Sequence, residues 1–364
     1  MGRRRGLPRP LDLYFPAVVG GRSHRLGLVV SAAICAGVLL APGTAARAEA
    51  GAVTWQAPTP APGSVVGGDA GTKVTVQLAA FSAVPTATIR IAPASKLPQG
   101  ARLSSTPGNP ARALLSWVPR GAQVGTHRFR FSAVDSSSAP VSSQPLSFQV
   151  RVAPGTVKLS GFENVSRWAF VRRQTVVRAA PRSSAYAKAR LKVWTPEYYS
   201  NPVLALQERI DRTGTWVQVR LPILPNNSTG WVKRGALGSF RITRDHLVVD
   251  RAATRATLFR NGVAIFTTRV GVGKSYWPTP RGEFYITEKM SGFHNAAYGP
   301  IAFGTSARSA VLTDWPGGGY IGIHGTDTPG LIPGHVSHGC VRLRNASILR
   351  LARLMGVGTP LTIQ

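Results

Sequence analysis

Cysteine is nearly absent from this chain of 364 residues, which holds only Cys35 and Cys340. Cys35 lies inside an apolar N-terminal segment of the kind that directs export. If that segment is removed, one cysteine remains and no intramolecular disulfide can form. A single thiol in an oxidising compartment is a liability unless it is buried or used. Cys340 is therefore either an inert buried residue or a reactive one, and the residues around it in the sequence distinguish these two interpretations.

Acidic residues are also scarce, with 14 Asp and Glu against 44 Lys and Arg and a net charge of +30. Residues 1–50 contain seven Arg and two acids, so the remainder keeps a charge of +25 (30 − 5). Such a surface suits nucleic acid, an anionic membrane or an anionic wall polymer. Because the basic residues are dispersed, with no Lys/Arg block after residue 5, we expect an anionic cell wall and no nucleic acid as partner.

Long apolar runs are missing beyond the N-terminus. The run at 26–40 follows an Arg-rich stretch and is shorter than the roughly 20 residues that span a bilayer. Residues 46–48 (ARA) have the small-x-small pattern of a cleavage site. We expect residues 1–48 to be a signal peptide, with an uncleaved membrane anchor as the alternative. Either way, the protein is expected outside the cytoplasm, in the cell wall or secreted.

Helical periodicity is scarce as well. Residues 49–65 are rich in Pro, Gly and Ala and predict a linker. Residues 66–153 alternate apolar and polar positions in short runs separated by turn residues, which predicts a β-sandwich. Residues 168–240 contain closely spaced short strands, and Trp216 and Trp231 there could form either a binding face or part of the core.

Residues 243–364 form the last predicted unit, mostly β. Asn261-Gly262 separates two strand-like runs, and this dipeptide favours a tight type I′ hairpin. Only residues 347–355 (SILRLARLM) carry a helical stripe, with Asn345 as the expected N-cap. The fold class is therefore mainly β and multi-domain, with one short helix in the last domain.

Three residues capable of acid–base or nucleophilic chemistry gather near the end of the chain: His324, His338 and Cys340. A thiol becomes a good nucleophile once it loses its proton, and a neighbouring imidazole can accept that proton. Gly339 permits a tight turn beside the thiol. The rival interpretation is a zinc site that adds His335 to these three, although a bound metal would quench the thiolate.

The motifs at 323–326 (IHGT) and 337–343 (SHGCVRL), with 279–284 (TPRGEF) upstream, resemble those of the YkuD-type L,D-transpeptidase catalytic domain. Residues 66–153 resemble a bacterial Ig-like module, and residues 168–240 resemble an SH3-like barrel. These two modules would act as spacers or contact the wall.

The resemblance implies a role for each matching residue. Cys340 would be the nucleophile, and His324 the general base that later acts as an acid. The carbonyl of Gly325 would orient His324, while His338 would line the site and assist.

The remaining motif residues would support the loop that carries the thiol. Ser337 and Gly339 would shape the turn, and the amides of Gly339 and Cys340 would stabilise the oxyanion. Arg342 would hold the loop or meet a substrate carboxylate.

The activity that the resemblance implies is acyl transfer on peptidoglycan tetrapeptide stems, through a cysteine thioester, to form 3→3 cross-links in cell-wall biogenesis and cell shape. No metal or organic cofactor is expected. The acceptor stays open between a stem amine, a D-amino acid, water and a protein. Alternatives are a sortase-like transpeptidase, a wall peptidase, and a non-catalytic wall-binding protein.

Overall fold

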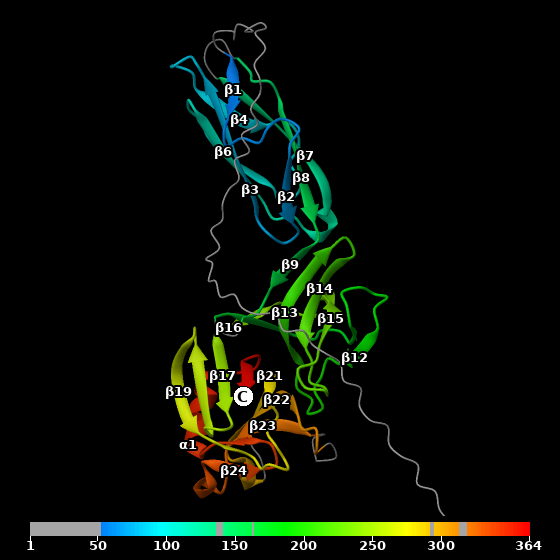
Figure 1. The fold of residues 1–364 in the computed structure, drawn as a ribbon, viewed down its shortest axis with the longest axis vertical. Helices are drawn as coiled ribbons and strands as arrows, with labels where there is room; N and C mark the ends of the chain where they lie inside the picture. The colour runs from blue at the N-terminus through cyan, green and yellow to red at the C-terminus, as the bar shows by residue number, and fades with distance from the viewer. Residues whose placement is uncertain (1–51, 136–140, 162–163, 292–294, 313–318) are drawn as a thin grey trace, which may run out of the picture. The chain divides into compact units, whose positions relative to one another are not determined.

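The computed structural model describes residues 52–135, 141–161, 164–291, 295–312 and 319–364 (Figure 1). The predicted signal segment 1–48 lies outside these ranges. Nearly all the regular elements in the described ranges are strands, with one α-helix near the end of the chain, which confirms the mainly β prediction. No helix in the described ranges has the length and apolarity needed to cross a membrane.

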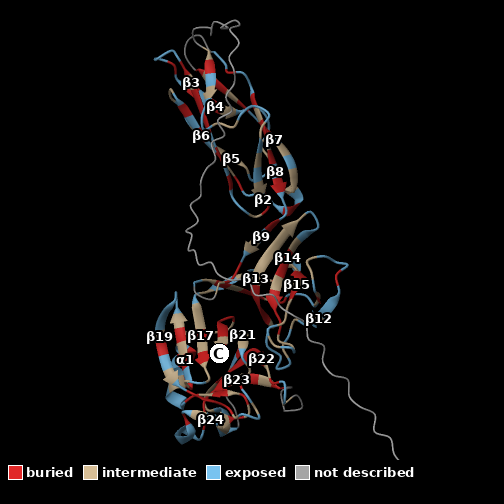
Figure 2. Cartoon of the chain, viewed as in Figure 1, coloured by how far each residue is buried: buried red, intermediate tan, exposed pale blue. Residues whose placement is uncertain are grey.

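The first group of strands forms two four-stranded sheets, with orders β1-β3-β6-β5 and β2-β8-β7-β4. Both sheets contribute to one core, in which Leu78 from one sheet and Phe131 from the other are buried. The alternation seen in the sequence places these apolar side chains on the inner faces, and the backbone of such buried residues is red in Figure 2. The strands are β1 Val53–Gln56, β2 Val65–Asp69, β3 Val74–Ser82, β4 Ile89–Pro93, β5 Arg102–Thr106, β6 Ala111–Trp117, β7 Gly125–Asp135 and β8 Leu146–Ala153.

The linker predicted over 49–65 is wrong in part. Strand β1 lies inside it and pairs with β3, and Val53 is buried in the core. The Pro and Gly residues that suggested a linker follow this strand, at 58–63, and leave its pairing undisturbed.

The second group of strands forms one eight-stranded sheet, in which β12-β11-β15-β14-β13-β10-β16 are neighbours and β9 pairs with β13. The sheet extends beyond the predicted bounds 168–240 at both ends. Trp216 is buried here, so it does not supply the exposed binding face that was one alternative, whereas Trp231 is only partly buried. The strands are β9 Gly155–Lys158, β10 Ser166–Phe170, β11 Thr175–Arg178, β12 Ala187–Leu191, β13 Pro202–Asp211, β14 Gly214–Arg220, β15 Thr229–Lys233 and β16 Arg241–Thr243.

The third group of strands forms a ten-stranded sheet of order β19-β18-β17-β26-β21-β22-β23-β25-β20-β24. Its apolar core includes Phe284, Phe303 and Ile323, from three adjacent strands. The strands are β17 Asp245–Asp250, β18 Arg255–Arg260, β19 Val263–Arg269, β20 Gly271–Gly273, β21 Gly282–Ser291, β22 Ile301–Arg308, β23 Tyr320–His324, β24 Gly334–Ser337, β25 Val341–Arg342 and β26 Pro360–Ile363.

Two local predictions in this domain have different outcomes. The hairpin is confirmed, because Asn261 (φ 51°) and Gly262 (φ 76°) join β18 to β19 with the two positive φ angles of a type I′ turn. The helix α1 spans Asn345–Leu354, but its N-cap is Arg344. The N-cap role expected for Asn345 is wrong, because its side chain instead accepts a hydrogen bond from the amide of Thr326.

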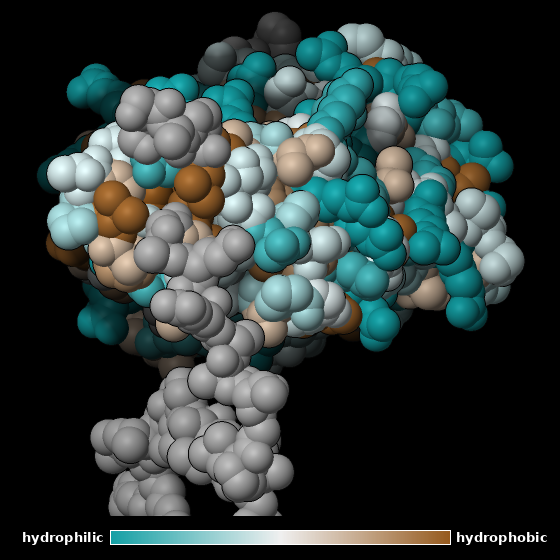
Figure 3. Space-filling view, turned by 90° about the horizontal axis from the view of Figure 1, so that it is seen from above, coloured by the Kyte–Doolittle hydropathy of each residue, from teal (hydrophilic) through white to brown (hydrophobic). Residues whose placement is uncertain are grey.

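The view in Figure 3 shows a surface that is largely hydrophilic, with hydrophobic residues in small groups. This agrees with the wide spread of Lys and Arg along the chain, because dispersed charges cover many parts of a surface.

Candidate active site

Cys340 lies in the short connection between β24 and β25, and Ser337 determines its backbone path. The hydroxyl of Ser337 donates to the carbonyl of Cys340 at 2.6 Å and accepts from the amide of Gly339 at 3.1 Å. Gly339 has φ of +116°, and a Cβ at this position would lie 2.9 Å from Cδ1 of Ile321. Only glycine adopts this turn without strain, so residues 337–340 form a preset loop that presents the thiol.

The thiol of Cys340 contacts the middle of strand β23. The amide of Gly322 donates to Sγ at 3.3 Å, which favours the thiolate. Burial has the larger effect and raises the pKa of Cys340, while Gly322 and the charge of Arg342 act against it. The resting sulfur is therefore a protonated thiol.

His324 ends strand β23, and its ring is held by its own backbone neighbour. Nδ1 lies 2.7 Å from the carbonyl oxygen of Gly325. Since a carbonyl can only accept, Nδ1 carries the proton and Nε2 is left as the basic nitrogen. This is the contact that the orienting role expected for Gly325 requires. Tyr298 packs edge-on against the ring, with centroids 5.0 Å apart.

Burial also sets the charge of His324, which is 4% exposed. It lowers the pKa of the ring to about 4, the carbonyls of Gly325 and Ala297 oppose this shift, and the charge of Arg342 adds to it. At neutral pH, the ring is therefore an uncharged base.

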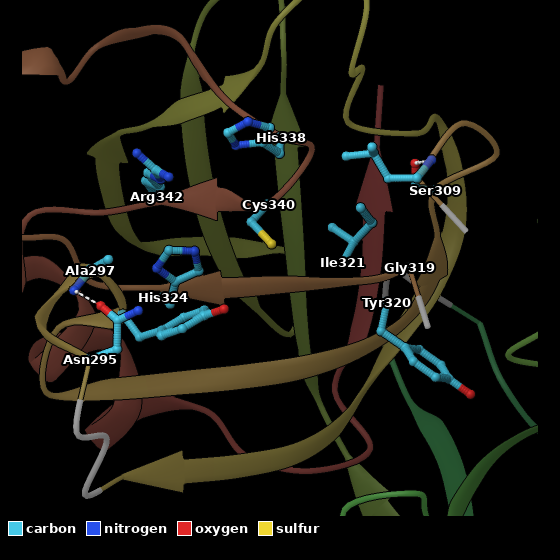
Figure 4. A pocket seen from close by; sticks show the side chains of 12 residues that line it. Asn295, Ala297, Ser309, Gly319, Tyr320, Ile321, His324, His338, Cys340 and Arg342 are labelled. Atoms are coloured by element: carbon cyan, nitrogen blue, oxygen red, sulfur yellow. Dashed lines mark hydrogen bonds between the residues drawn. The ribbon is translucent and has the colours of Figure 1, made fainter. Parts of the chain in front are cut away.

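The imidazole of His324 and the sulfur of Cys340 meet over Gly322. A Cβ added at Gly322 would lie 3.8 Å from Sγ and 3.9 Å from Cδ2 of His324. Figure 4 shows His324 and His338 on either side of the Cys340 side chain, in a pocket of about 240 Å³. Two residues 16 positions apart in the sequence are thus brought together as the paired motifs predict.

His338 and Arg342 line the same pocket. The ring of His338 packs against Trp277, with centroids 4.0 Å apart, and partial burial and the charges of Arg342 and Lys274 lower its pKa. In the described part of the chain, the buried Nε of Arg342 has no hydrogen-bond acceptor. Because this atom has no exposed surface, it does not distinguish the two roles expected for Arg342, and both stay predictions.

The oxyanion role expected for Gly339 does not fit the structure. Its amide already donates to the hydroxyl of Ser337 and is not free to stabilise a developing negative charge. The physical reason is that the short serine side chain satisfies the amide two residues later, and so closes the turn. The amide of Cys340 keeps its candidate role.

Thr279 supports the nucleophile loop, which sequence reasoning missed. Its buried hydroxyl donates to the carbonyl of Gly339 at 2.7 Å and accepts from the amide of Gly273 at 2.8 Å. The pattern of the motif at 279–284 does not indicate this role, because a hydrogen bond between residues 60 positions apart leaves no local signal in a sequence.

Asn345 supports the other side of the site in the same way. Its Oδ1 accepts from the amide of Thr326 at 2.9 Å, directly after the carbonyl that orients His324. A Cβ at Gly325 would collide with this oxygen, so the close approach requires glycine there.

The four residues of the zinc alternative do not come together. His335 faces the carbonyl of Gly273 at 3.2 Å and lines a different cavity from Cys340. No three His, Cys, Asp or Glu side chains within the described ranges are grouped as metal ligands.

Comparison with known proteins agrees with this geometry. Residues 244–363 match the family model of the YkuD L,D-transpeptidase catalytic domain. The protein named L,D-transpeptidase YkuD in Bacillus subtilis (strain 168) is 32% identical over 118 residues, 32% of this chain and 65% of that protein. Its counterpart in Bacillus licheniformis is 31% identical over 106 residues, 29% of this chain and 57% of that protein. The chain thus spans less than two thirds of each relative.

Among solved structures, the catalytic domain of an L,D-transpeptidase from E. faecium matches at 23% identity with a TM-score of 0.26, over 33% of this chain and 96% of that one. The similarity therefore depends on the curated relatives and on the family model, whose matched residues include both histidines and the cysteine. Residues 244–363 are thus similar to the YkuD L,D-transpeptidase catalytic domain, both by the family model and by the curated relatives.

Proposed function

We propose that this protein is a cysteine acyltransferase of the cell wall, an L,D-transpeptidase that forms 3→3 cross-links between peptidoglycan stems. The proposal depends on one observation. His324, whose Nδ1 is hydrogen-bonded to the carbonyl of Gly325, lies beside the thiol of Cys340 in one small pocket. A thiol and an oriented neutral imidazole are what acyl transfer through a thioester requires.

The reaction has two halves, acylation of the cysteine and transfer of the acyl group, and His324 returns in each half the proton that it takes up. Nε2 of His324 takes the proton of Cys340 while Sγ attacks the carbonyl carbon of the third stem residue. The tetrahedral intermediate collapses, the bond to the terminal D-Ala breaks, and the imidazolium returns its proton to the departing amine. An acceptor amine then attacks the thioester, His324 takes its proton, and the thiol is regenerated.

The Gly322 amide assists the first half of this reaction. It donates to Sγ and becomes a stronger partner once the sulfur is charged, because hydrogen bonds to ionised groups are stronger than neutral ones. Arg342 lines the same pocket, and a substrate carboxylate bound by its guanidinium would place the scissile carbonyl over Cys340.

The enzyme would work outside the cytoplasmic membrane. Support comes from the N-terminal export pattern at 1–48 and from the +30 charge, which suits an anionic wall. The two upstream β modules would hold the catalytic domain near its polymeric substrate.

The test is exchange on a defined tetrapeptide stem, followed by mass spectrometry. The wild-type chain should release D-Ala and carry one acyl group on Cys340, and Cys340→Ala should do neither. A carbapenem should likewise add once, at Cys340. Activity that survives in Cys340→Ala would end the nucleophile assignment. An unreactive thiol in a chain that still binds wall would favour the non-catalytic alternative.

A further inference from the structure

A second cavity, of about 710 Å³, lies beside the pocket that holds Cys340. One wall is the segment 189–198, and the other includes Glu288 of β21 and Arg308 of β22. Tyr320 lines both this cavity and the Cys340 pocket. In Figure 4, its side chain points away from the thiol. The two hollows are therefore neighbours across one side chain.

Strand register connects Glu288 to the nucleophile. Glu288 pairs with Gly304, Gly304 pairs with Gly322, and the amide of Gly322 contacts Sγ of Cys340. Two strand spacings separate the Glu288 backbone from Gly322, roughly 10 Å. The carboxylate leans toward the thiol, because a Cβ at Gly304 would lie 2.5 Å from Oε1 of Glu288.

The carboxylate and the thiol also share one face of the sheet. Residues directly opposite each other in an antiparallel pair project to the same side. A Cβ at Gly304 would meet Glu288, and a Cβ at Gly322 would meet Cys340. Two paired glycines therefore lie between the acid and the nucleophile, where side chains would otherwise fill the path.

Glu288 is unusual among the 14 acids of this basic chain. It is 7% exposed, and it accepts hydrogen bonds from Thr195 at 2.9 Å and Thr287 at 3.3 Å. It forms no ion pair with any Lys or Arg in the described part of the chain. Burial and the nearby charge of Glu197 raise its pKa. A buried carboxylate in this situation is stabilised by a cation that enters the cavity.

We infer that the second cavity binds the side-chain ammonium of the diamino acid in the donor stem, with Glu288 as its counter-ion. The inference rests on the proposed function. The carbonyl that Cys340 attacks belongs to that residue, so its side chain starts beside the thiol and extends into the adjacent cavity. An ammonium group paired with Glu288 has no free electron pair to attack the thioester, so the occupant is not the attacking acceptor amine.

The walls of the cavity suit the rest of such a side chain. Tyr320 offers an aromatic surface at the entrance, with the guanidinium of Arg308 over its ring at 4.4 Å. Trp194 is 56% exposed and lines the opposite side. Aromatic faces pack against an aliphatic chain and attract an ammonium group.

The experiment compares two tetrapeptide stems, one with the free side-chain amine and one with that amine acetylated. In the full-length wild-type chain, kcat/KM for acylation of Cys340 should favour the free amine by about tenfold or more, since a charge-assisted hydrogen bond contributes on the order of 1.5–3 kcal/mol. Glu288→Gln should reduce the preference to about twofold or less. Glu283→Gln, on the same strand but away from the cavity, should keep it.

Glu288→Gln retains a side-chain oxygen that can accept the hydrogen bond from the Thr195 hydroxyl, so the variant should still fold. A carbapenem with an uncharged side chain has no ammonium group for Glu288 to bind. The rate at which it acylates Cys340 should therefore be the same in Glu288→Gln and in the wild type. Equal use of both stems by the wild type would overturn the inference, whether or not the variant folds, and so would a full preference retained in Glu288→Gln. If no stem acylates Cys340 while the carbapenem does, the proposed function itself fails.

Discussion

Burial makes the resting state of the catalytic pair uncharged. It lowers the pKa of His324 and raises the pKa of Cys340, so each shift disfavours the charged form of its group. An imidazolium–thiolate pair at rest is therefore disfavoured, and proton transfer belongs to the attack on substrate. The hydrogen bond from Gly322 to Sγ lowers the cost of that transfer.

The depressed pKa of His324 predicts a low acid limit for activity. The base must be neutral to accept the thiol proton, and its pKa of about 4 keeps it neutral well below the usual value near 6.5. We expect kcat/KM to stay level from pH 7 to about 5 and to fall near pH 4. Stopped assays with a neutral stem analogue across this range measure it.

The stability of the fold also changes with pH in this range and must be measured separately from activity. Because the folded pKa of His324 lies below the unfolded value, the unfolded state takes up the proton first, and stability falls as pH drops from about 6.5 toward 4. Circular dichroism at each pH separates unfolding from titration. A fall in activity centred near 6.5, with the fold intact, contradicts the assignment of His324 as a buried base.

Thr279 should matter for catalysis although it lies outside the reacting pair. Thr279→Val removes one hydroxyl and leaves the Gly339 carbonyl and the Gly273 amide without their buried partner. We expect kcat/KM to fall by about tenfold or more and stability to fall by about 1–3 kcal/mol. Steady-state kinetics and thermal unfolding measure the two effects.

Two further variants test whether loss of the Thr279 hydroxyl itself causes the fall in activity and stability. Thr279→Ser should restore most of the activity, because it keeps the donor and acceptor. Thr267→Val, which changes an exposed hydroxyl on β19, should be neutral. Wild-type activity in Thr279→Val would show that the loop holds its shape without this bond.

At the scale of elements, the sequence predicted what is local and missed what is long-range. The hairpin at Asn261-Gly262, the short helix and the strand that ends at His324 follow from turn chemistry and periodicity. Strand β1 was missed, because the prolines that follow it suggested a linker. The roles of Thr279 and Asn345 depend on contacts made only when distant segments fold together.

The turn at Gly339 offers a test of the nucleophile loop as an element. Gly339→Ala places a Cβ at φ of +116° and against Ile321, so the 337–340 loop must shift. We expect loss of at least about 90% of Cys340 acylation, because a misplacement of about 1 Å costs about 100-fold in rate. Mass spectrometry of the carbapenem adduct over time measures it.

Gly330 provides the matched control for that variant. It lies in the nearby loop, has no atom within 4 Å of an added Cβ, and does not have a positive φ. Gly330→Ala should therefore acylate like the wild type. Equal acylation by Gly339→Ala would show that the loop tolerates an ordinary side chain and that its preset turn is unimportant.

At the scale of the whole molecule, the catalytic domain and the module before it share specific contacts. The buried hydroxyl of Tyr285 donates to the carbonyl of Pro202, and Asn227 accepts from the amide of Glu283. Thr195 reaches Glu288 in the same manner. The preceding module thus contributes directly to the cavity beside the active site, and a sequence-based division into separate domains could not have indicated this.

The net charge of +30, of which +25 remains without residues 1–50, predicts how the chain binds the anionic wall polymer of the proposed function. Exposed charges are screened over about 8 Å at physiological ionic strength, so attraction to an anionic polymer must weaken as salt is added. We expect binding to isolated cell walls to fall by about tenfold or more between 50 and 500 mM salt, measured by co-sedimentation. Carbapenem acylation of Cys340, which depends on a small buried site, should change by less than about threefold. If binding to cell walls does not change with salt concentration, it depends instead on contacts through exposed aromatic residues such as Trp194 and Tyr198.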